Sequence, residues 1–305
     1  INDYPSRLSC FDGENWTTYS VRNGHKIPAG QVRSICEDID GNIWIGTTDE
    51  VGKFDGSSWE KYTVADGLTG SDIRNIMIEK NGNLWFATSD GISIFDGNTI
   101  TQLRKDDGLA SNDITYIFED EDGGIWVGTG DRGLNYSDRK WQTITTQSVL
   151  PDNTINDIFE DSHGNMWFGT QEGLVKFDGN QWSTITSADG LPGNEIRTIT
   201  ELISPNFNRE LWVGTDKGIG VYNGISWSVW TQEEGFKGNT SSVYAIAEDS
   251  SGNVWVGTGI YFSQIDRYGG LSKFDGNDWE WTVSYTHLRA HETSLHLVCR
   301  LLLEK

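Results

Sequence analysis

Arginine recurs at one position of a repeating pattern in this sequence. Arg33, Arg74 and Arg197 each follow the first apolar residue of a short alternating segment. A guanidinium group pairs with carboxylate, sulfate or phosphate through parallel hydrogen bonds. Three arginines at one position reverse the local sign of charge in a chain whose net charge is −22. They indicate a site for an anionic or polyhydroxylated ligand.

The other copies of the pattern carry different residues at this position, and a specific function is expected where copies differ. These residues are Thr115, Asn156 and Tyr244. Loops predicted to reach the same mouth would add Asp49, Asp90, Asp131, Arg132 and Asp216, and an insertion would add Tyr261, Arg267 and Tyr268. The alternative is that each arginine pairs with an acid of a neighbouring copy and seals the wall of the fold.

The segment that carries each arginine precedes a second recurring phrase, Gly41-Asn42-Ile43-Trp44-Ile45-Gly46-Thr47. Its tryptophan returns with spacings of 41, 41, 41, 45 and 43 residues, at Trp44, Trp85, Trp126, Trp167, Trp212 and Trp255. A fixed period in this range is typical of tandem supersecondary units. The six tryptophans are expected to form the core between units, rather than a surface on which carbohydrate stacks.

Each unit is predicted to contain four strands. Asp-Gly or Asn-Gly between two alternating runs marks a hairpin, as at Asp55-Gly56 before Trp59. Val32 and Ile35 lie three apart in the first strand, so we expect them on opposite faces of a strand that is packed on both sides. Four-stranded units of this length predict an all-β fold, the β-propeller.

The unit boundaries predict six complete blades within a propeller of residues 1–283. The blades are expected at 25–65, 66–106, 107–147, 148–187, 188–232 and 233–283. Residues 1–24 supply only the last two strands of a blade, so we infer a seven-bladed ring with one blade half missing. Insertions at 204–210 and 260–269 interrupt the period and are predicted to be loops.

Residues 284–305 depart from this pattern and resemble an adapter-derived, non-native translation at the end of a metagenomic reading frame. The segment lacks Gly, Trp and Asp, and it is excluded from the fold prediction. The alternative is a C-terminal helix docked on a blade edge. For this reason His287, His291 and His296 are not taken as metal ligands.

Composition excludes several classes of function. The chain has 45 acidic and 23 basic residues, which disfavours binding to nucleic acid or to anionic membranes. No apolar run is long enough to cross a bilayer. The three cysteines match neither a zinc site nor a disulfide framework. No metal or cofactor is therefore predicted.

Two other features have plain structural explanations. The turn at Asp38 and Asp40 could suggest a calcium loop, but its second oxygen is not kept in the other copies, which favours a hairpin turn. The turn is also similar to the sialidase Asp-box, but in that motif Asp precedes Gly by two positions, and other residues occupy this place here. Trp230 and Trp281 fall outside the repeat and are candidates for exposed rings, with packing on the outer strand as the alternative.

The unit Gly-Leu-x-x-Asn-x-Ile-x-x-Ile-x-Glu-Asp-x-x-Gly-Asn-x-Trp-x-Gly-Thr resembles the two-component regulator propeller repeat. Residues 108–129 and 190–215 show the resemblance most plainly. It implies a seven-bladed propeller from the periplasmic sensor region of a bacterial hybrid histidine kinase, often concerned with polysaccharide use. Kinase, receiver and DNA-binding segments are absent from this sequence, so the resemblance implies a sensor part whose downstream signalling domains are missing.

The first functional hypothesis is a non-catalytic sensor or binding propeller, periplasmic or extracellular, for a glycan-derived or anionic small ligand. The second is an exported scaffold for protein interactions. The third is a propeller glycosidase or lyase. Catalysis needs a unique set of acid, base or nucleophile, whereas nearly every acid here repeats with the blade.

Overall fold

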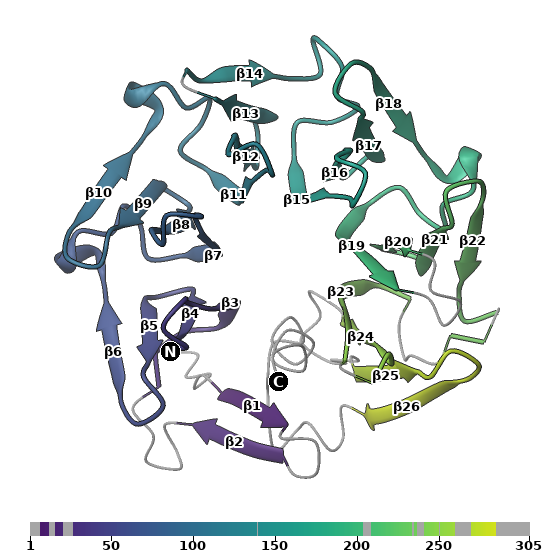
Figure 1. Cartoon of the computed structure of the whole chain (residues 1–305), viewed down its shortest axis with the longest axis horizontal. Coiled ribbons are helices and arrows are strands. Elements are labelled where there is room, and N and C mark those ends of the chain that lie inside the picture. Colours follow the sequence, from purple (N-terminus) through teal and green to yellow (C-terminus); the bar gives the residue numbers. More distant parts are fainter. Residues whose placement is uncertain are drawn as a thin grey trace, which may run out of the picture. The chain divides into compact units, whose positions relative to one another are not determined.

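The computed structural model describes residues 7–11, 16–20, 27–138, 140–203, 209–233, 235–236, 241–249, 251–259 and 270–284. Within these ranges the chain forms β-strands and short 3-10 helices. Six sheets have four strands and one sheet has two. Each four-stranded sheet is one blade, and its strands are antiparallel neighbours in chain order (Figure 1). The predicted all-β propeller fold with six complete blades is confirmed.

Blades 1 to 3 belong to the first of two compact units, which contains residues 17–155. Blade 1 consists of β3 (Val32–Glu37), β4 (Ile43–Thr47), β5 (Val51–Phe54) and β6 (Trp59–Tyr62). Blade 2 consists of β7 (Ile73–Ile78), β8 (Leu84–Thr88), β9 (Gly91–Phe95) and β10 (Ile100–Leu103). Blade 3 consists of β11 (Ile114–Glu119), β12 (Ile125–Thr129), β13 (Leu134–Ser137) and β14 (Gln142–Ile144).

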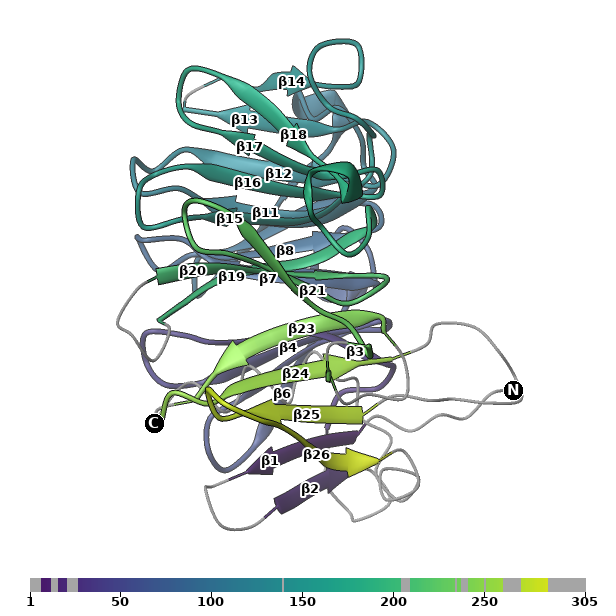
Figure 2. The same ribbon diagram turned by 90° about the vertical axis from the view of Figure 1, so that its right-hand side faces the viewer.

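Blades 4 to 6 belong to the second unit, which begins at Asn156. Blade 4 consists of β15 (Ile155–Glu160), β16 (Met166–Thr170), β17 (Leu174–Phe177) and β18 (Trp182–Ile185). Blade 5 consists of β19 (Ile196–Ile203), β20 (Arg209–Thr215), β21 (Ile219–Tyr222) and β22 (Trp227–Trp230). Blade 6 consists of β23 (Val243–Glu248), β24 (Val254–Thr258), β25 (Gly270–Phe274) and β26 (Trp279–Ser284). In both views the strands of one blade lie side by side, as in β16, β17 and β18 (Figure 2).

A separate sheet of two strands lies at the N-terminus. It contains β1 (Arg7–Phe11) and β2 (Trp16–Ser20), whose residues divide between the two units. Two strands are what the sequence predicts for residues 1–24. The seventh blade inferred from them stays a prediction, and residues 285–305 of the proposed tail lie outside the described part of the chain.

Short 3-10 helices connect some blades: η2 (Val64–Asp66), η3 (Lys105–Asp107) and η4 (Ser187–Asp189). A capping box starts η2, because Thr63 accepts a hydrogen bond from Ala65 while Asp66 accepts one from the backbone N–H of Thr63. Gly67 ends the helix with φ of 113°, in the left-handed region where glycine is favoured. The next residue, Leu68, is buried in the core between blades 1 and 2.

The acidic turn before each central tryptophan is a structural clamp. Oxygen atoms of Asp38 accept hydrogen bonds from Nε1 of Trp44 at 2.7 Å and from the backbone N–H of Asn42 at 2.9 Å. Equivalent carboxylate–indole bonds join Glu79 to Trp85, Asp120 to Trp126, Asp161 to Trp167 and Asp249 to Trp255. The six central tryptophans are only 1% to 8% exposed, which confirms their predicted role in the core.

Bulges change the predicted faces of the inner strands. The sequence pattern predicts opposite faces for the first and fourth residues of each strand, such as Ile73 and Ile76, and this prediction is wrong. Their partners on β8, Thr88 and Phe86, lie two residues apart and therefore share one face. The cause is a β-bulge at Arg74, which adds one residue between the two pairs. Both isoleucines accordingly pack in the cluster between blades 1 and 2.

The opposite face of an inner strand packs against the following blade. Ser34 Oγ accepts a hydrogen bond from the backbone N–H of Ile76 at 2.9 Å, and Asp157 Oδ2 accepts one from Ile199 at 2.7 Å. Inner strands lie at sheet edges, so these side chains satisfy backbone groups that have no partner in the sheet. The strand is packed on both sides, as predicted, but through other residues than expected.

The sequence predicts that Trp230 either exposes its ring or packs on the outer strand, and it packs. Its ring lies 5.4 Å from the ring of Phe274 and 6.0 Å from that of Trp279, and it is half-buried against the core of blades 5 and 6. The prediction of an exposed ring is wrong, because the large apolar surface of Trp230 packs against neighbouring aromatics. The side chain of Trp281 lies outside the described residues.

Candidate functional site

In five of the six blades the variable residue of the inner strand occupies a bulge. In β3, β7, β11, β19 and β23 the first and third residues pair with consecutive residues of the next strand, so the second is the extra one. We call this second place the bulge position, and it holds Arg33, Arg74, Thr115, Asn156, Arg197 and Tyr244 in blades 1 to 6. The residue directly before each inner strand occupies the leading position, which holds Gln31, Asp72, Asp113, Thr154, Glu195 and Ser242. A bulge can redirect a side chain, which gives this position a role in recognition.

Glycine opposite the bulge allows close contact between blades. Gly46 pairs with the third residue of β3, and a Cβ atom there would lie 2.6 Å from Cγ2 of Ile73 in blade 2. A Cβ atom at Gly214 in β20 would lie equally close, 2.6 Å from Cγ1 of Val243 in blade 6. The glycine therefore admits the first apolar residue of the following inner strand. This brings the bulge position of one blade close to the leading position of the next.

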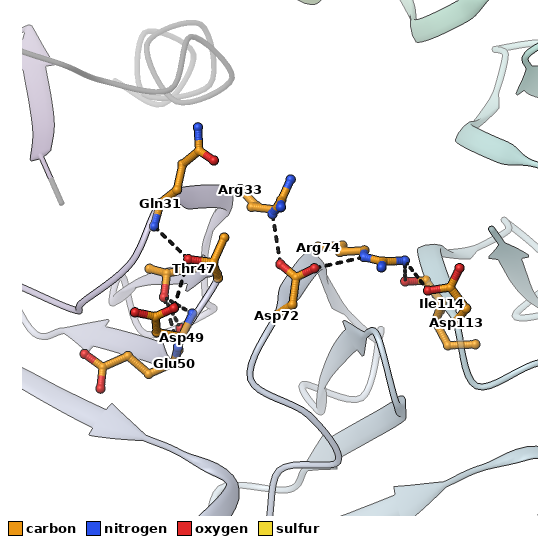
Figure 3. A network of polar contacts seen from close by, with 10 residues as sticks. Gln31, Arg33, Thr47, Asp49, Glu50, Asp72, Arg74, Asp113 and Ile114 are labelled. Atoms are coloured by element: carbon orange, nitrogen blue, oxygen red, sulfur yellow. Dashed lines mark hydrogen bonds and ion pairs between the residues drawn. The ribbon is translucent and has the colours of Figure 1, made fainter. Parts of the chain in front are cut away.

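In unit 1 these two positions form a chain of ion pairs, which we call the arginine ladder (Figure 3). Arg33 Nε donates to Asp72 Oδ1 at 2.9 Å. Arg74 Nε lies 3.3 Å from Asp72 Oδ2, and Arg74 Nη1 donates to Asp113 Oδ1 at 2.7 Å. Arg74 Nη1 also lies 3.3 Å from the carbonyl oxygen of Ile114. Each arginine thus reaches forward to the acid at the leading position of the following blade.

The arginine ladder matches the sealed-wall alternative of the sequence analysis. Two guanidinium groups and two carboxylates cancel in charge, so the reversal of sign expected at Arg33 and Arg74 is absent here. Arg33, Arg74 and Asp72 are 25% to 32% exposed, so the ion pairs of Asp72 are less screened by solvent than pairs on the open surface, whereas Asp113 is 42% exposed. These two arginines act as structural groups within unit 1.

The arginine at the bulge position of blade 5, Arg197, has different contacts from those of unit 1. Arg197 Nη2 lies 3.0 Å from Glu195 Oε1, the acid at the leading position of its own blade. The guanidinium carbon lies 4.3 Å from the centre of the Tyr244 ring, in a cation–π contact. Nε and Nη1 of Arg197 are buried and have no hydrogen-bond partner among the described residues. Two charged donors are therefore left for another group to satisfy.

The two donors of Arg197 lack a carboxylate partner because of the residue at the leading position of the following blade. Blade 6 has Ser242 there instead of an acid, and its Oγ donates to the carbonyl oxygen of Asp216 at 3.2 Å. The backbone N–H of Asp216 in turn donates to the carbonyl oxygen of Glu195 at 3.2 Å. Asp216 Oδ1 is also buried without a hydrogen-bond partner among the described residues. An unpaired acceptor and two unpaired donors thus occur around these connected segments of blades 5 and 6.

The remaining bulge positions are occupied by neutral side chains. Asn156 Nδ2 donates to the carbonyl oxygen of Ile196 at 2.8 Å, so it binds the following blade as the arginines of unit 1 do. Thr115 Oγ1 is buried with no hydrogen-bond partner in the described part of the chain. Neither residue adds charge to the site.

Most of the predicted loop acids are engaged locally. Asp49 accepts from Thr48 Oγ1 at 3.0 Å and lies in the turn after β4, separate from the arginine ladder (Figure 3). Asp90 lies 3.6 Å from Arg104, which follows the outer strand of the same blade. Asp131 pairs at 3.5 Å with the adjacent and exposed Arg132. The other predicted loop residues, Tyr261, Arg267 and Tyr268, lie outside the described residues.

Three residues of the site escaped the sequence prediction: Asp72, Asp113 and Glu195. They precede the apolar pattern, so a search confined to the strands passes over them. The available signal was their recurrence at one place, directly before the first apolar residue of each copy. Alignment on that residue places an acid there in three of the six blades.

The turn acids do not form a metal site within the described residues, where no cluster of possible metal ligands occurs. Burial disfavours ionisation of Asp38, but hydrogen bonds from Trp44 and Asn42 outweigh it and hold its pKa below the usual value. In blade 5 Glu210 bonds to the indole of Trp212, and burial raises the pKa of Glu210 because this bond offsets it only in part. Asp38 thus serves the hairpin turn in which it lies, whereas Glu210 lies within strand β20.

Fold and repeats together define the class as a β-propeller built from four-stranded blades. The model of the two-component regulator propeller family matches residues 26–49, 67–90, 108–131, 149–172 and 237–259. The chain therefore contains repeats of the two-component regulator propeller family. No curated protein sequence matches it significantly.

Solved structures share the fold at low sequence identity. The extracellular domain of BT3049 from B. thetaiotaomicron, described as a hybrid two-component system, has a TM-score of 0.68 and 21% identity, covering 84% of this chain and 35% of that one. The extracellular domain of BT4673 from the same organism, described as a one-component system, has a TM-score of 0.67 and 21% identity, with coverage of 83% and 36%. This chain therefore spans about a third of each of those chains.

Virginiamycin B lyase from Staphylococcus aureus is also similar in fold. A catalytically inactive histidine-to-alanine form of that enzyme with quinupristin has a TM-score of 0.63 and 15% identity, covering 87% of both chains. The same fold thus serves sensor proteins and a lyase, so function must be argued from the site. Among the described residues, no helix has the length and apolar character needed to span a membrane.

Proposed function

We propose that this chain is the extracytoplasmic ligand-sensing propeller of a bacterial two-component regulator, and that it binds a small polar ligand, glycan-derived or anionic, without catalysing a reaction. The regulator propeller repeats and the likeness to extracellular domains of regulatory systems support the sensor role. Ligand binding is proposed at the bulge position of blade 5. Downstream signalling domains would transmit the signal.

One observation carries this proposal: Arg197 has two buried nitrogen donors without partners in the described residues. Leaving a buried donor unsatisfied costs roughly 1–3 kcal/mol, and more for a charged group. A ligand that accepts these hydrogen bonds would recover that free energy on binding. The arginine ladder offers no such gain, because Arg33 and Arg74 already hold carboxylates.

The propeller lyases supply the competing function. Replacement of one histidine by alanine gives the catalytically inactive form of the S. aureus enzyme. The described residues here contain one histidine, His163, which lies exposed in the turn before Trp167. Its backbone N–H donates to Asp161 Oδ1, as part of the same clamp that other blades build without histidine. A catalytic role for His163 is therefore disfavoured, and a protein-interaction scaffold remains the other alternative.

Ligand screening tests the proposal directly. The purified chain would be screened by thermal shift against oligosaccharides, sugar acids and small organic acids, and stabilising compounds would then be measured by calorimetry. We expect Arg197→Gln to weaken binding by roughly tenfold or more, since a charge-assisted hydrogen bond contributes about 1.5–3 kcal/mol.

Arg33→Gln is the matched control, because it makes the same change at the same position of blade 1. It should leave affinity within about twofold, given that each 1.4 kcal/mol corresponds to about tenfold. A screen without any ligand would contradict the sensor proposal and favour a scaffold. Chemical conversion of a bound compound, detected by mass spectrometry, would favour an enzyme.

A further inference from the structure

We propose that the ligand at Arg197 binds through a carboxylate, which takes the place that a neighbouring acid fills beside Arg33 and Arg74. This inference rests on the proposed function, whose site it specifies further. The chain itself supplies the template, because the same bulge position is seen with and without a carboxylate partner.

The template is the arginine ladder of unit 1. Arg33 uses Nε to bind the carboxylate of Asp72, and Arg74 uses Nη1 to bind that of Asp113. Both acids occupy the leading position of the following blade. A carboxylate in this place is thus the ordinary partner of an arginine at the bulge position.

The site in unit 2 lacks this carboxylate but keeps the arginine at the bulge position. Ser242 occupies the leading position after Arg197, and its hydroxyl donates to the backbone of Asp216. The two atoms of Arg197 left without partners among the described residues are Nε and Nη1. These are the same two atom types that bind the forward acids in unit 1. A carboxylate would therefore satisfy the two hydrogen-bond donors of Arg197 that have no partner among the described residues.

A second acid beside Arg197 does not exclude a carboxylate ligand. Arg74 is in contact with two carboxylates at once, Asp72 through Nε and Asp113 through Nη1. Arg197 holds one carboxylate, Glu195, through Nη2. A ligand carboxylate would bring Arg197 to the same state as Arg74.

Binding requires side chains to shift. The Arg197 side chain is 15% exposed, compared with 32% for Arg33 and 26% for Arg74, and Tyr244 covers one face of the guanidinium group. Movement of the Tyr244 ring or of Arg197 at the bulge would uncover Nε and Nη1. The ring would remain available to pack against an apolar face of the ligand.

Calorimetry with matched probes tests this inference. D-glucuronate and D-glucose differ at one carbon, which carries a carboxylate in the acid and a hydroxymethyl group in the sugar. L-malate tests whether the sugar ring is needed. We expect D-glucuronate or L-malate to bind at least tenfold more tightly than D-glucose. Preference between the two acids distinguishes a sugar acid from an acyclic hydroxy acid.

Ser242→Asp is the decisive variant, because it supplies the missing carboxylate from the chain. It should lower affinity for the acid by at least tenfold while the protein stays folded. Thr154→Asp is the matched control: it adds the same charge at another leading position and removes a similar bond, from Thr154 Oγ1 to the carbonyl oxygen of Gly130. Thr154 follows the neutral Thr115 of blade 3, so this variant should bind the acid as the wild type does.

The outcomes separate the two proposals. Equal or tighter binding of D-glucose, or acid binding that survives Ser242→Asp, overturns the carboxylate inference and leaves the sensor function standing. If neither the acids nor any compound of the wider screen binds, both proposals fail. A raised thermal midpoint of Ser242→Asp relative to Thr154→Asp would show that the new carboxylate reaches Arg197.

Discussion

Units 1 and 2 place an arginine on the same bulge of the same strand, yet the two environments differ. Arg74 binds an acid of its own blade and an acid of the following one. Arg197 keeps the acid of its own blade, and the leading position that holds the second acid in unit 1 is occupied by Ser242. The substitution of one residue type at the leading position thus separates a saturated ion pair from an arginine with unmet donors.

The comparison shows how a repeat protein can create a site without changing its fold. The clamp and the bulge each recur in five of the six blades, because they help to build the sheet and the core. Recognition can then vary through the side chains at the bulge and leading positions, which are not buried in the apolar core.

Removing the shared acid of unit 1 should have the largest effect. Asp72→Ala leaves Arg33 and Arg74 without a common partner, and we expect a loss of about 2 kcal/mol in the free energy of unfolding. Glu195→Ala in unit 2 should cost less than about 1 kcal/mol, because Glu195 is 42% exposed and its ion pair is screened by solvent. Urea denaturation measures both values. Equal losses would break the distinction between the two units.

Supplying the absent acid of unit 2 should stabilise the protein. Ser242→Asp gives Arg197 a forward partner and satisfies buried donors, for a gain of about 1 kcal/mol, reduced by repulsion from Glu195. Thr154→Asp lacks an arginine to pair with and should be neutral or destabilising. The same denaturation experiment decides this case, and a destabilised Ser242→Asp protein would show that Arg197 cannot reach the leading position.

The turn clamps should respond to acid alike in both units. Burial acts to raise the pKa of Asp38 and of Asp249, but hydrogen bonds from Trp44 and Trp255 outweigh it and lower the pKa of each acid. A lowered pKa stabilises the fold above the unfolded value near 3.8, and this contribution disappears as the pH falls through the folded value.

Asp38→Asn and Asp249→Asn should therefore each flatten the decline of stability below about pH 4, and by a similar amount. The readout is the urea midpoint between about pH 2.5 and 6. A response from only one variant would mean that the units differ in their scaffold as well as in their arginines.

The contact between Arg197 and Tyr244 should contribute least to stability. Tyr244→Leu removes the aromatic face and should cost about 0.5–1 kcal/mol, whereas Tyr244→Phe should cost only a few tenths. Thermal unfolding of both variants measures the difference. A large loss in Tyr244→Phe would assign the hydroxyl group a structural role beyond the cation–π contact.

The repeat made most of the fold predictable. The spacing of Trp44 and its counterparts, with the Asp-Gly hairpins, leads to four-stranded blades because each signal arises from local chemistry. The faces of the inner strands were mispredicted at pairs such as Ile73 and Ile76. A count of residues assumes a regular strand, and the bulge at Arg74 adds one residue that the hydrophobic pattern does not reveal.

The site was predictable only in part. The pattern located Arg33, Arg74 and Arg197, and it offered both a ligand site and a sealed wall as explanations. Choosing between them required the residues before each strand, Asp72 and Ser242, whose proximity to the preceding blade comes from packing between sheets. Long-range pairing of this kind is not encoded in the local sequence around either residue.

A double-mutant cycle between Arg197→Gln and Ser242→Asp tests directly whether the missing forward acid leaves the donors of Arg197 unmet. The account predicts a favourable coupling free energy of about 1 kcal/mol or more between Arg197 and the aspartate introduced at position 242, measured by urea denaturation at low salt. A coupling of zero would show that the leading position of blade 6 does not face Arg197, and it would contradict the account.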